Sequence, residues 1–194
     1  LANTVNVTGG FSQSSGALTL ASGAQLVVSG AASFTGGTIA TSVSGTANYL
    51  AGSAAGTLIQ GGTGSGYDGV TVQTGSVTGL ALQAQTSGTN LVARALNDYI
   101  GVSLGSLSNT GTLSAATAVY VAASGSLGSL TNSGTLSGSN AAIHNAGALG
   151  PITNTGVIAG NIDNLTAQAL QISGGTLTGY AANTQGTITN TLGN

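Results

Sequence analysis

The feature that most constrains this chain is a repeat in its second half. Residues 104–113 read LGSLSNTGTL, residues 127–136 read LGSLTNSGTL and residues 149–158 read LGPITNTGVI. The spacing of these copies matches one coil of a β-solenoid, and a single coil cannot bury its apolar face alone. The repeat therefore predicts coils stacked about 4.8 Å apart, the spacing of paired strands, around one continuous interior.

The asparagine of each copy recurs in register, at Asn109, Asn132 and Asn154, and each begins an Asn-[Thr/Ser]-Gly triplet. Because Asn and Gly tolerate a positive φ, the triplet predicts a tight bend between two strands. Stacked amides at the same bend can hydrogen-bond from coil to coil, so we expect a structural asparagine ladder at these three positions. A ligand-binding role for the same asparagines is the alternative.

The repeat suggests three sections within one continuous domain. Residues 101–194 carry the regular coils. Residues 1–48 alternate short apolar segments with Gly/Ser turns, which predicts about two more coils, with Phe11 and Phe34 stacked as neighbours. Residues 49–100 break the rhythm and predict either antiparallel hairpins, since antiparallel pairing suits short connections, or another β-rich insertion packed on the solenoid. The pattern is interrupted at both ends of the chain, so we expect the chain to be a fragment of a longer protein.

Composition excludes several classes of protein. One arginine and no lysine cannot supply the clustered positive charge that a nucleic-acid binder needs. Glu, Lys and Met, which favour helices, are absent. Charged residues make up 2% of the chain and the mean hydropathy is +0.36, which argues against charge-driven disorder. The lack of cysteine favours a bacterial surface protein that crosses the periplasm unfolded and without disulfides.

The repeat pattern L-x-x-[LI]-[ST]-N-[ST]-G-[TV]-[LI], with AIHNAG at 142–147 and FSQSSGALTLASGAQLVVSGAASFTGG at 11–37, resembles the passenger domains of bacterial autotransporter adhesins and filamentous-haemagglutinin-like exoproteins. The resemblance implies a right-handed parallel β-helix that is secreted through an outer-membrane β-barrel and exposed at the bacterial cell surface. It also implies roles in adhesion, autoaggregation or biofilm formation. Contact with a membrane would then be made only through a translocator barrel outside this sequence.

Together, repeat and resemblance predict an all-β fold, a right-handed parallel β-helix with coils of about 22–23 residues and a β-hairpin-rich insertion. The longest aliphatic or aromatic run, residues 118–123, is far shorter than the roughly 20 residues of a membrane-spanning helix.

The titratable side chains offer little for catalysis. Three carboxylates, Asp68, Asp98 and Asp163, and one imidazole, His144, are present. We interpret Asp68 as a turn residue, Asp98 as the ion-pair partner of Arg94, and Asp163 as a bend residue at the position that His144 occupies one repeat earlier. No enzymatic activity, cofactor or metal site is predicted, because the chain lacks calcium-loop motifs and its one Gly-rich string precedes no helix.

Binding through the surface remains as a function. The middle section holds three of the four charged residues and three of the five tyrosines. We therefore take its charged and aromatic residues as the candidate binding surface, while expecting at least half of the tyrosines to be structural: Tyr67, Asp68, Arg94, Asp98 and Tyr99.

Three functions stay open. The first is a non-enzymatic adhesin that associates with copies of itself or with a glycan or protein on a host or neighbouring cell. The second is a passive stalk that presents a distal domain. The third is ice binding, which requires Thr-x-Thr ranks at the coil spacing, whereas the TLTL and VTVQT segments are out of register with the repeat.

Overall fold

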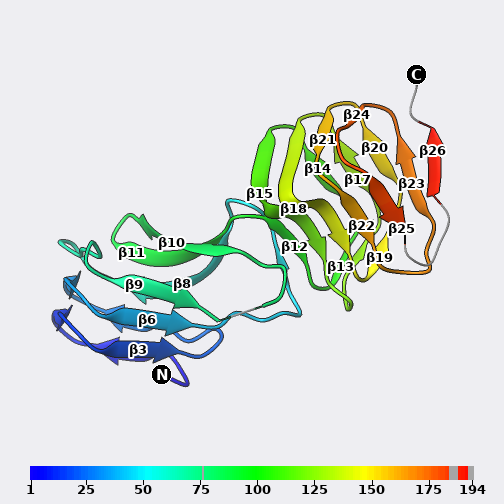
Figure 1. Ribbon diagram of the computed structural model, residues 1–194. Coiled ribbons are helices and arrows are strands. Elements are labelled where there is room, and N and C mark those ends of the chain that lie inside the picture. The colour runs from blue at the N-terminus through cyan, green and yellow to red at the C-terminus, as the bar shows by residue number, and fades with distance from the viewer. Residues whose placement is uncertain (76, 184–187, 192–194) are drawn as a thin grey trace. The chain divides into compact units, whose positions relative to one another are not determined.

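A computed structural model describes residues 1–75, 77–183 and 188–191 (Figure 1). The described residues form β-strands and no helix, and the strands stack as parallel coils of a β-solenoid, about eight turns in all. This confirms the predicted fold class. The chain forms two compact units, which we describe separately: unit 1 comprises Leu1–Gly45, Gly52–Thr78 and Leu82–Ala95, and unit 2 comprises Thr46–Ala51, Gly79–Ala81 and Leu96–Asn194.

Unit 1 begins with two coils of three short strands each. The first coil contains β1 (Val5–Val7), β2 (Phe11–Gln13) and β3 (Ala17–Leu20), and the second contains β4 (Leu26–Val28), β5 (Ala32–Phe34) and β6 (Thr38–Thr41). Each strand of the first coil pairs in parallel with its equivalent in the second, as Val5 does with Leu26. The strands are short because Gly/Ser turns interrupt the apolar alternation every few residues.

A third coil follows where the sequence predicts antiparallel hairpins. Strand β8 (Ala54–Gln60) pairs in parallel with β4, and β9 (Thr71–Thr74) pairs in parallel with β6. The prediction is therefore wrong for β9, which continues the solenoid, and holds only in part for β8, which continues the solenoid through β4 and also pairs antiparallel with β11 (Asn90–Ala95). The interval between partners is longer here than between the first two coils, in part because residues 46–51 leave this coil and belong to unit 2.

The predicted hairpin is present further along. Strands β10 (Leu82–Ser87) and β11 (Asn90–Ala95) pair antiparallel through six continuous residue pairs, and β11 also pairs antiparallel with β8. Within the same unit, the ring centroids of Phe11 and Phe34 lie 5.5 Å apart, as predicted. The two rings are neighbours but not register partners, since Phe34 pairs with Gln13.

Unit 2 holds the regular coils that the repeat predicts (Figure 1). Its first strand, β7 (Asn48–Tyr49), pairs antiparallel with β12, and all other pairings in the unit are parallel among the described residues. The coils are built from β12 (Asp98–Ile100), β13 (Ser103–Leu104), β14 (Leu107–Asn109), β15 (Thr112–Val121), β16 (Ser126–Leu127), β17 (Leu130–Asn132), β18 (Thr135–Asn145), β19 (Ala148–Leu149), β20 (Ile152–Asn154), β21 (Val157–Ala159), β22 (Ile162–Asn164), β23 (Leu170–Ser173), β24 (Thr176–Leu177), β25 (Ala181–Asn183) and β26 (Ile188–Thr191).

Columns of aliphatic side chains fill the interior of unit 2. Leu107 pairs with Leu130, which pairs with Ile152, which pairs with Ile172, and all four side chains are buried. Burying one such side chain contributes about 1.5–3 kcal/mol. The repeated apolar position in each copy is therefore the residue that holds adjacent coils together.

The glycine of the Asn-[Thr/Ser]-Gly triplet has a different role from the one predicted. The bends lie where expected, between β14 and β15 and at the equivalent places, but Gly111, Gly134 and Gly156 do not have a positive φ. A Cβ at Gly134 would lie 2.0 Å from the carbonyl oxygen of Gly111, and one at Gly156 would lie 2.0 Å from the oxygen of Gly134. Glycine is required because neighbouring coils approach closely at the bend.

Candidate functional site

The candidate residues of unit 1 differ in exposure. The Tyr67 side chain is buried and its hydroxyl donates to the Thr89 carbonyl over 2.7 Å, while its ring lies 5.8 Å from that of Phe34. Burial raises the pKa of the Tyr67 phenol, and a hydrogen bond with Ser65 partly offsets this. Asp68, the next residue, is exposed. It lines a shallow pocket of about 410 Å³ together with Ser33, Phe34, Thr35, Gly66 and Gly69.

Arg94 and Asp98, predicted to form an ion pair, each have their own partner. The Arg94 guanidinium donates to the Gly52 carbonyl in unit 1, and its Nε is buried without a hydrogen-bond partner. In unit 2, Asp98 Oδ1 accepts the Ala51 N–H over 2.8 Å. Burial raises the pKa of the Asp98 carboxyl, which the Ala51 hydrogen bond partly offsets, whereas a paired arginine would lower it.

Tyr99 belongs to a column of aromatic side chains in unit 2. Its ring centroid lies 6.2 Å from that of Tyr49 and 5.8 Å from that of Tyr120, and the Tyr120 ring stacks on His144 at 4.8 Å. Burial raises the pKa of the Tyr99 phenol, and Tyr120 and Tyr49 raise it further. The column continues in register to Asp163, which pairs with His144 as the sequence predicts, but Asp163 is the central residue of strand β22 and does not lie at the predicted bend.

A buried asparagine secures the position of Gly79 against this column. Asn97 donates from Nδ2 to the Gly79 carbonyl and accepts the Ala81 N–H at Oδ1, both over 2.8 Å. Gly79 has a φ of 85°, and a Cβ there would lie 2.2 Å from the Tyr120 ring. The backbone of this glycine therefore covers one face of Tyr120.

The five candidate residues do not form one exposed surface. Tyr67, Asp98 and Tyr99 are buried, Arg94 is half-buried, and Asp68 alone of the five is exposed. The structure gives the two tyrosines packing roles.

The three predicted asparagines form a ladder along unit 2. Asn109 Nδ2 donates to Asn132 Oδ1 over 2.7 Å, and Asn132 Nδ2 donates to Asn154 Oδ1 over the same distance. Asn154 Nδ2 donates to the Thr176 carbonyl, and the amide ladder ends at Asn154 because the next coil has Gly174 at the equivalent position. Asn132 and Asn154 are fully buried, so these amides hold coils together and present no polar group to a ligand.

A second asparagine pair was missed by the sequence analysis. Asn145 Nδ2 donates to Asn164 Oδ1 over 2.6 Å, and both side chains are buried. The signal was present in the sequence, because the aligned segments AIHN and NIDN both end in asparagine.

The exposed face beside the first ladder carries a row of hydroxyl groups, which we call the hydroxyl row. It consists of residues that pair across four successive coils: Ser108, Thr131, Thr153 and Ser173. The first three are exposed and Ser173 is half-buried. Ser108, Thr131 and Thr153 are the central residues of three-residue strands, so strand alternation directs them outward. Ser173, in contrast, ends β23, and its hydroxyl donates to the Ile152 carbonyl. The row presents hydroxyl donors and acceptors at the coil spacing with no charge among them.

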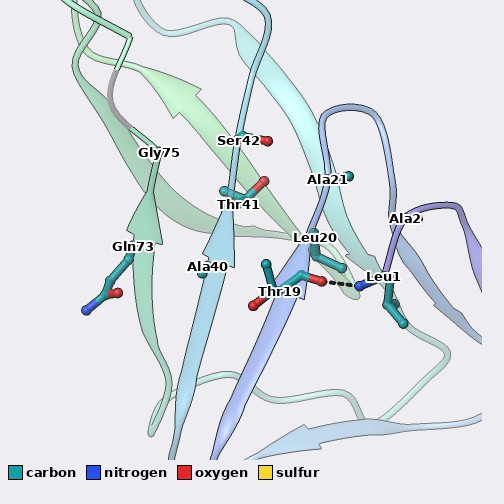
Figure 2. Close-up of a pocket in the computed structure, with 10 residues that line it drawn as sticks. All are labelled: Leu1, Ala2, Thr19, Leu20, Ala21, Ala40, Thr41, Ser42, Gln73 and Gly75. Atoms are coloured by element: carbon teal, nitrogen blue, oxygen red, sulfur yellow. Dashed lines mark hydrogen bonds between the residues drawn. The ribbon is translucent and has the colours of Figure 1, made fainter.

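A larger pocket lies in unit 1 at the ends of β3, β6 and β9 (Figure 2). Its volume is about 540 Å³, and the amino group of Leu1 at its border donates to the Thr19 carbonyl. Gln73 extends away from the other lining side chains (Figure 2). Among the described residues that line it no side chain is acidic or basic, so beyond the Leu1 amino group the pocket offers apolar contact, a few hydroxyl groups and the Gln73 amide.

Within the described residues, no group of three or more His, Cys, Asp or Glu side chains is placed to hold a metal ion. No helix that could cross a membrane occurs in this part of the chain. Comparison of the chain with protein-family models, with curated proteins and with solved structures finds no match.

Proposed function

We propose that this chain is a non-enzymatic segment of a bacterial surface adhesin, which attaches to copies of itself or to glycans or proteins on another surface. The observation that carries the proposal is the hydroxyl row on unit 2, repeated from coil to coil without a charged residue. Such a row offers dense hydrogen-bonding groups, and little electrostatic repulsion keeps two uncharged surfaces apart.

The resemblance to autotransporter passenger domains supports the same proposal. That resemblance rests on the repeat pattern, and the β-solenoid described above is the fold that it implies. Under this proposal the chain is exposed outside the cell, at the bacterial surface. Ligand binding would then be distributed over many weak contacts along a repeated face, in contrast to the single concave site of most small-molecule binders.

A test uses beads coated with the purified chain. Bead clustering and retention on immobilised glycans, matrix proteins and bacterial cells are measured against beads coated with an unrelated protein of similar net charge. The proposal expects clustering, retention, or both. Beads that neither cluster nor attach would remove the adhesive role and favour a passive stalk.

The stalk is the second candidate function, favoured by the buried asparagine ladder and the aliphatic columns that stack coil on coil. Deleting the coils of residues 101–179 from the protein on its native cells, while leaving the rest in place, separates the two. Loss of attachment supports the adhesin, and unchanged attachment supports the stalk.

A further inference from the structure

Strand β10 is an edge strand, and among the described residues it has a strand partner on one side only. The strand order in its sheet is β1-β4-β8-β11-β10, so β10 is paired through β11 alone. With six residues it is the longest edge strand in the described part of the chain. A long edge is a template for pairing with another strand.

The hairpin geometry determines which backbone groups are free. Ser87 and Asn90 flank the two-residue turn, in which Gly88 has a φ of 60°, as the first residue of a type II′ turn requires. The pair that closes a two-residue turn exchanges both backbone hydrogen bonds, and such pairs alternate with non-hydrogen-bonded pairs along an antiparallel ladder. Gln85 and Gln83 are therefore hydrogen-bonded to β11.

The remaining residues of the strand direct their backbone groups outward. By the same alternation, the N–H and C=O groups of Leu82, Ala84 and Thr86 point away from β11. The strand lacks two common protections of an edge, because LQAQTS contains no charged residue and no proline. Its pairing with β11 has no bulge that would twist the edge away.

We propose that the free edge of β10 pairs antiparallel with β10 of a second copy of this chain, with Ala84 opposite Ala84 of the second copy. In this register Leu82 faces Thr86 of the second copy, so every outward backbone group finds a partner. The arrangement is two-fold symmetric and self-complementary, as the closed interface of a homodimer must be. It adds a backbone-mediated contact between copies, separate from the hydroxyl row, to the self-association in the proposed function, and it rests on that proposal.

The side chains fit the same register. Gln83 and Gln85 are exposed on one face of the strand. They would face each other across the dimer as a non-hydrogen-bonded pair, whose Cα atoms lie about 4.5 Å apart. Each amide carries a donor and an acceptor, so the two can hydrogen-bond in either orientation. Two copies of this neutral strand place no like charges opposite one another. A charged peptide would find no opposite charge on β10, so a second copy is the favoured partner.

Disulfide trapping tests the register, because the chain has no cysteine of its own. Two full-length variants, Gln83→Cys and Gln85→Cys, carry tags of different mass, are mixed and are gently oxidised. The proposed register expects a severalfold excess of the mixed disulfide over either homodisulfide. Positions 83 and 85 would be directly opposite, whereas identical positions would be diagonal, about 7–8 Å apart and too distant to bridge. No cross-linking, or equal amounts of all three products, overturns the proposal.

A second pair of variants tests the free edge itself. Ala84→Pro removes the outward N–H without touching a hydrogen bond to β11, and Ala84→Ser keeps that N–H. Sedimentation is expected to show dimer for Ala84→Ser and monomer for Ala84→Pro, with unchanged far-ultraviolet circular dichroism in both. If Ala84→Pro does not fold, the cysteine variants still decide.

The bead assay separates this inference from the proposed function. Beads that cluster or attach without selective cross-linking keep the adhesive function and reject the β10 interface. Selective cross-linking with no bead clustering or attachment keeps the interface and rejects the adhesive function.

Discussion

Asn132 Nδ2 donates a hydrogen bond to Asn154 Oδ1 over 2.7 Å, and both side chains are fully buried. Asn132 also accepts from Asn109 and donates to the carbonyls of Gly134 and Val157. One side chain therefore satisfies polar groups of three successive coils. Because a buried polar group left without a partner is costly, the ladder should contribute strongly to the stability of unit 2.

Replacing Asn132 by alanine should lower the free energy of unfolding by about 2–4 kcal/mol, since it leaves buried groups of two neighbouring coils unsatisfied. Asn109→Ala, at the less buried end of the ladder, should lower the free energy of unfolding by about half as much. Urea denaturation followed by circular dichroism measures both. Equal losses at the two positions would contradict the role assigned to the ladder.

Gly134→Ala should lower the free energy of unfolding by about 1–3 kcal/mol, because the new Cβ meets the Gly111 carbonyl oxygen of the adjacent coil. Gly111→Ala is the matched control. It occupies the equivalent bend one coil earlier, has no heavy atom within 4 Å of the new Cβ, and does not have a positive φ. Its thermal midpoint should be unchanged or slightly raised. A control as damaging as Gly134→Ala would show that close approach is not the reason for these glycines.

Asp98 should make stability fall as the pH rises from about 4. Burial raises its folded-state pKa above the ordinary value of 3.8, so the folded chain binds more protons than the unfolded chain between these two values. Stability from this group is present below the unfolded pKa and is lost as the pH rises through the folded pKa. Asp98→Asn should remove this slope and be at least as stable at pH 7, with its amide oxygen still accepting the Ala51 N–H.

Asp68→Asn, at an exposed position, is the control for this titration and should leave the slope in place. Thermal unfolding at intervals between pH 3 and pH 7 measures all three proteins. A slope that survives in Asp98→Asn would assign it to another group.

Gly79 and Tyr120 should be energetically coupled. Gly79→Ala places a Cβ 2.2 Å from the Tyr120 ring, which is a steric clash. It also strains the backbone, because a φ of 85° is unfavourable for alanine. Adding Tyr120→Ala should recover at least about 1 kcal/mol of that loss, because it removes the clash and leaves the strain. A double-mutant cycle from chemical denaturation measures the coupling. Strictly additive losses would mean that the two residues do not touch.

The regular coils of unit 2 could be predicted from the sequence because the same apolar and asparagine positions recur at a nearly constant interval. The third coil of unit 1 could not. Residues 46–51 leave that coil for unit 2, so Val72 follows its partner Ile39 after a longer interval than Ile39 follows Leu18. A search for a constant period detects only coils of constant length. It cannot find the register of β8 and β9, because this coil is longer than the two before it.

The aromatic column shows a second limit of sequence reasoning. Tyr49, Tyr99, Tyr120 and His144 occupy one column, yet no sequence motif repeats among them, and Tyr49 enters through an antiparallel strand. The sequence analysis placed Tyr67 and Tyr99 on the candidate binding surface because tyrosines are rare in this chain. Both side chains are buried, since their burial depends on coils that only the folded chain brings together. Rarity in the sequence therefore did not indicate exposure.

The most direct test of the central claim, that an uncharged hydroxyl row mediates attachment, is the attachment of coated beads after charge is placed on the row. Thr131→Lys with Thr153→Lys adds two like charges in adjacent coils of the row, and Ala116→Lys with Ser139→Lys adds the same charge at exposed positions outside it. Both proteins should keep the circular dichroism of the original. We expect bead retention on glycans, matrix proteins and cells to be largely lost for the first pair and largely kept for the second. Equal attachment by both pairs would contradict the claim.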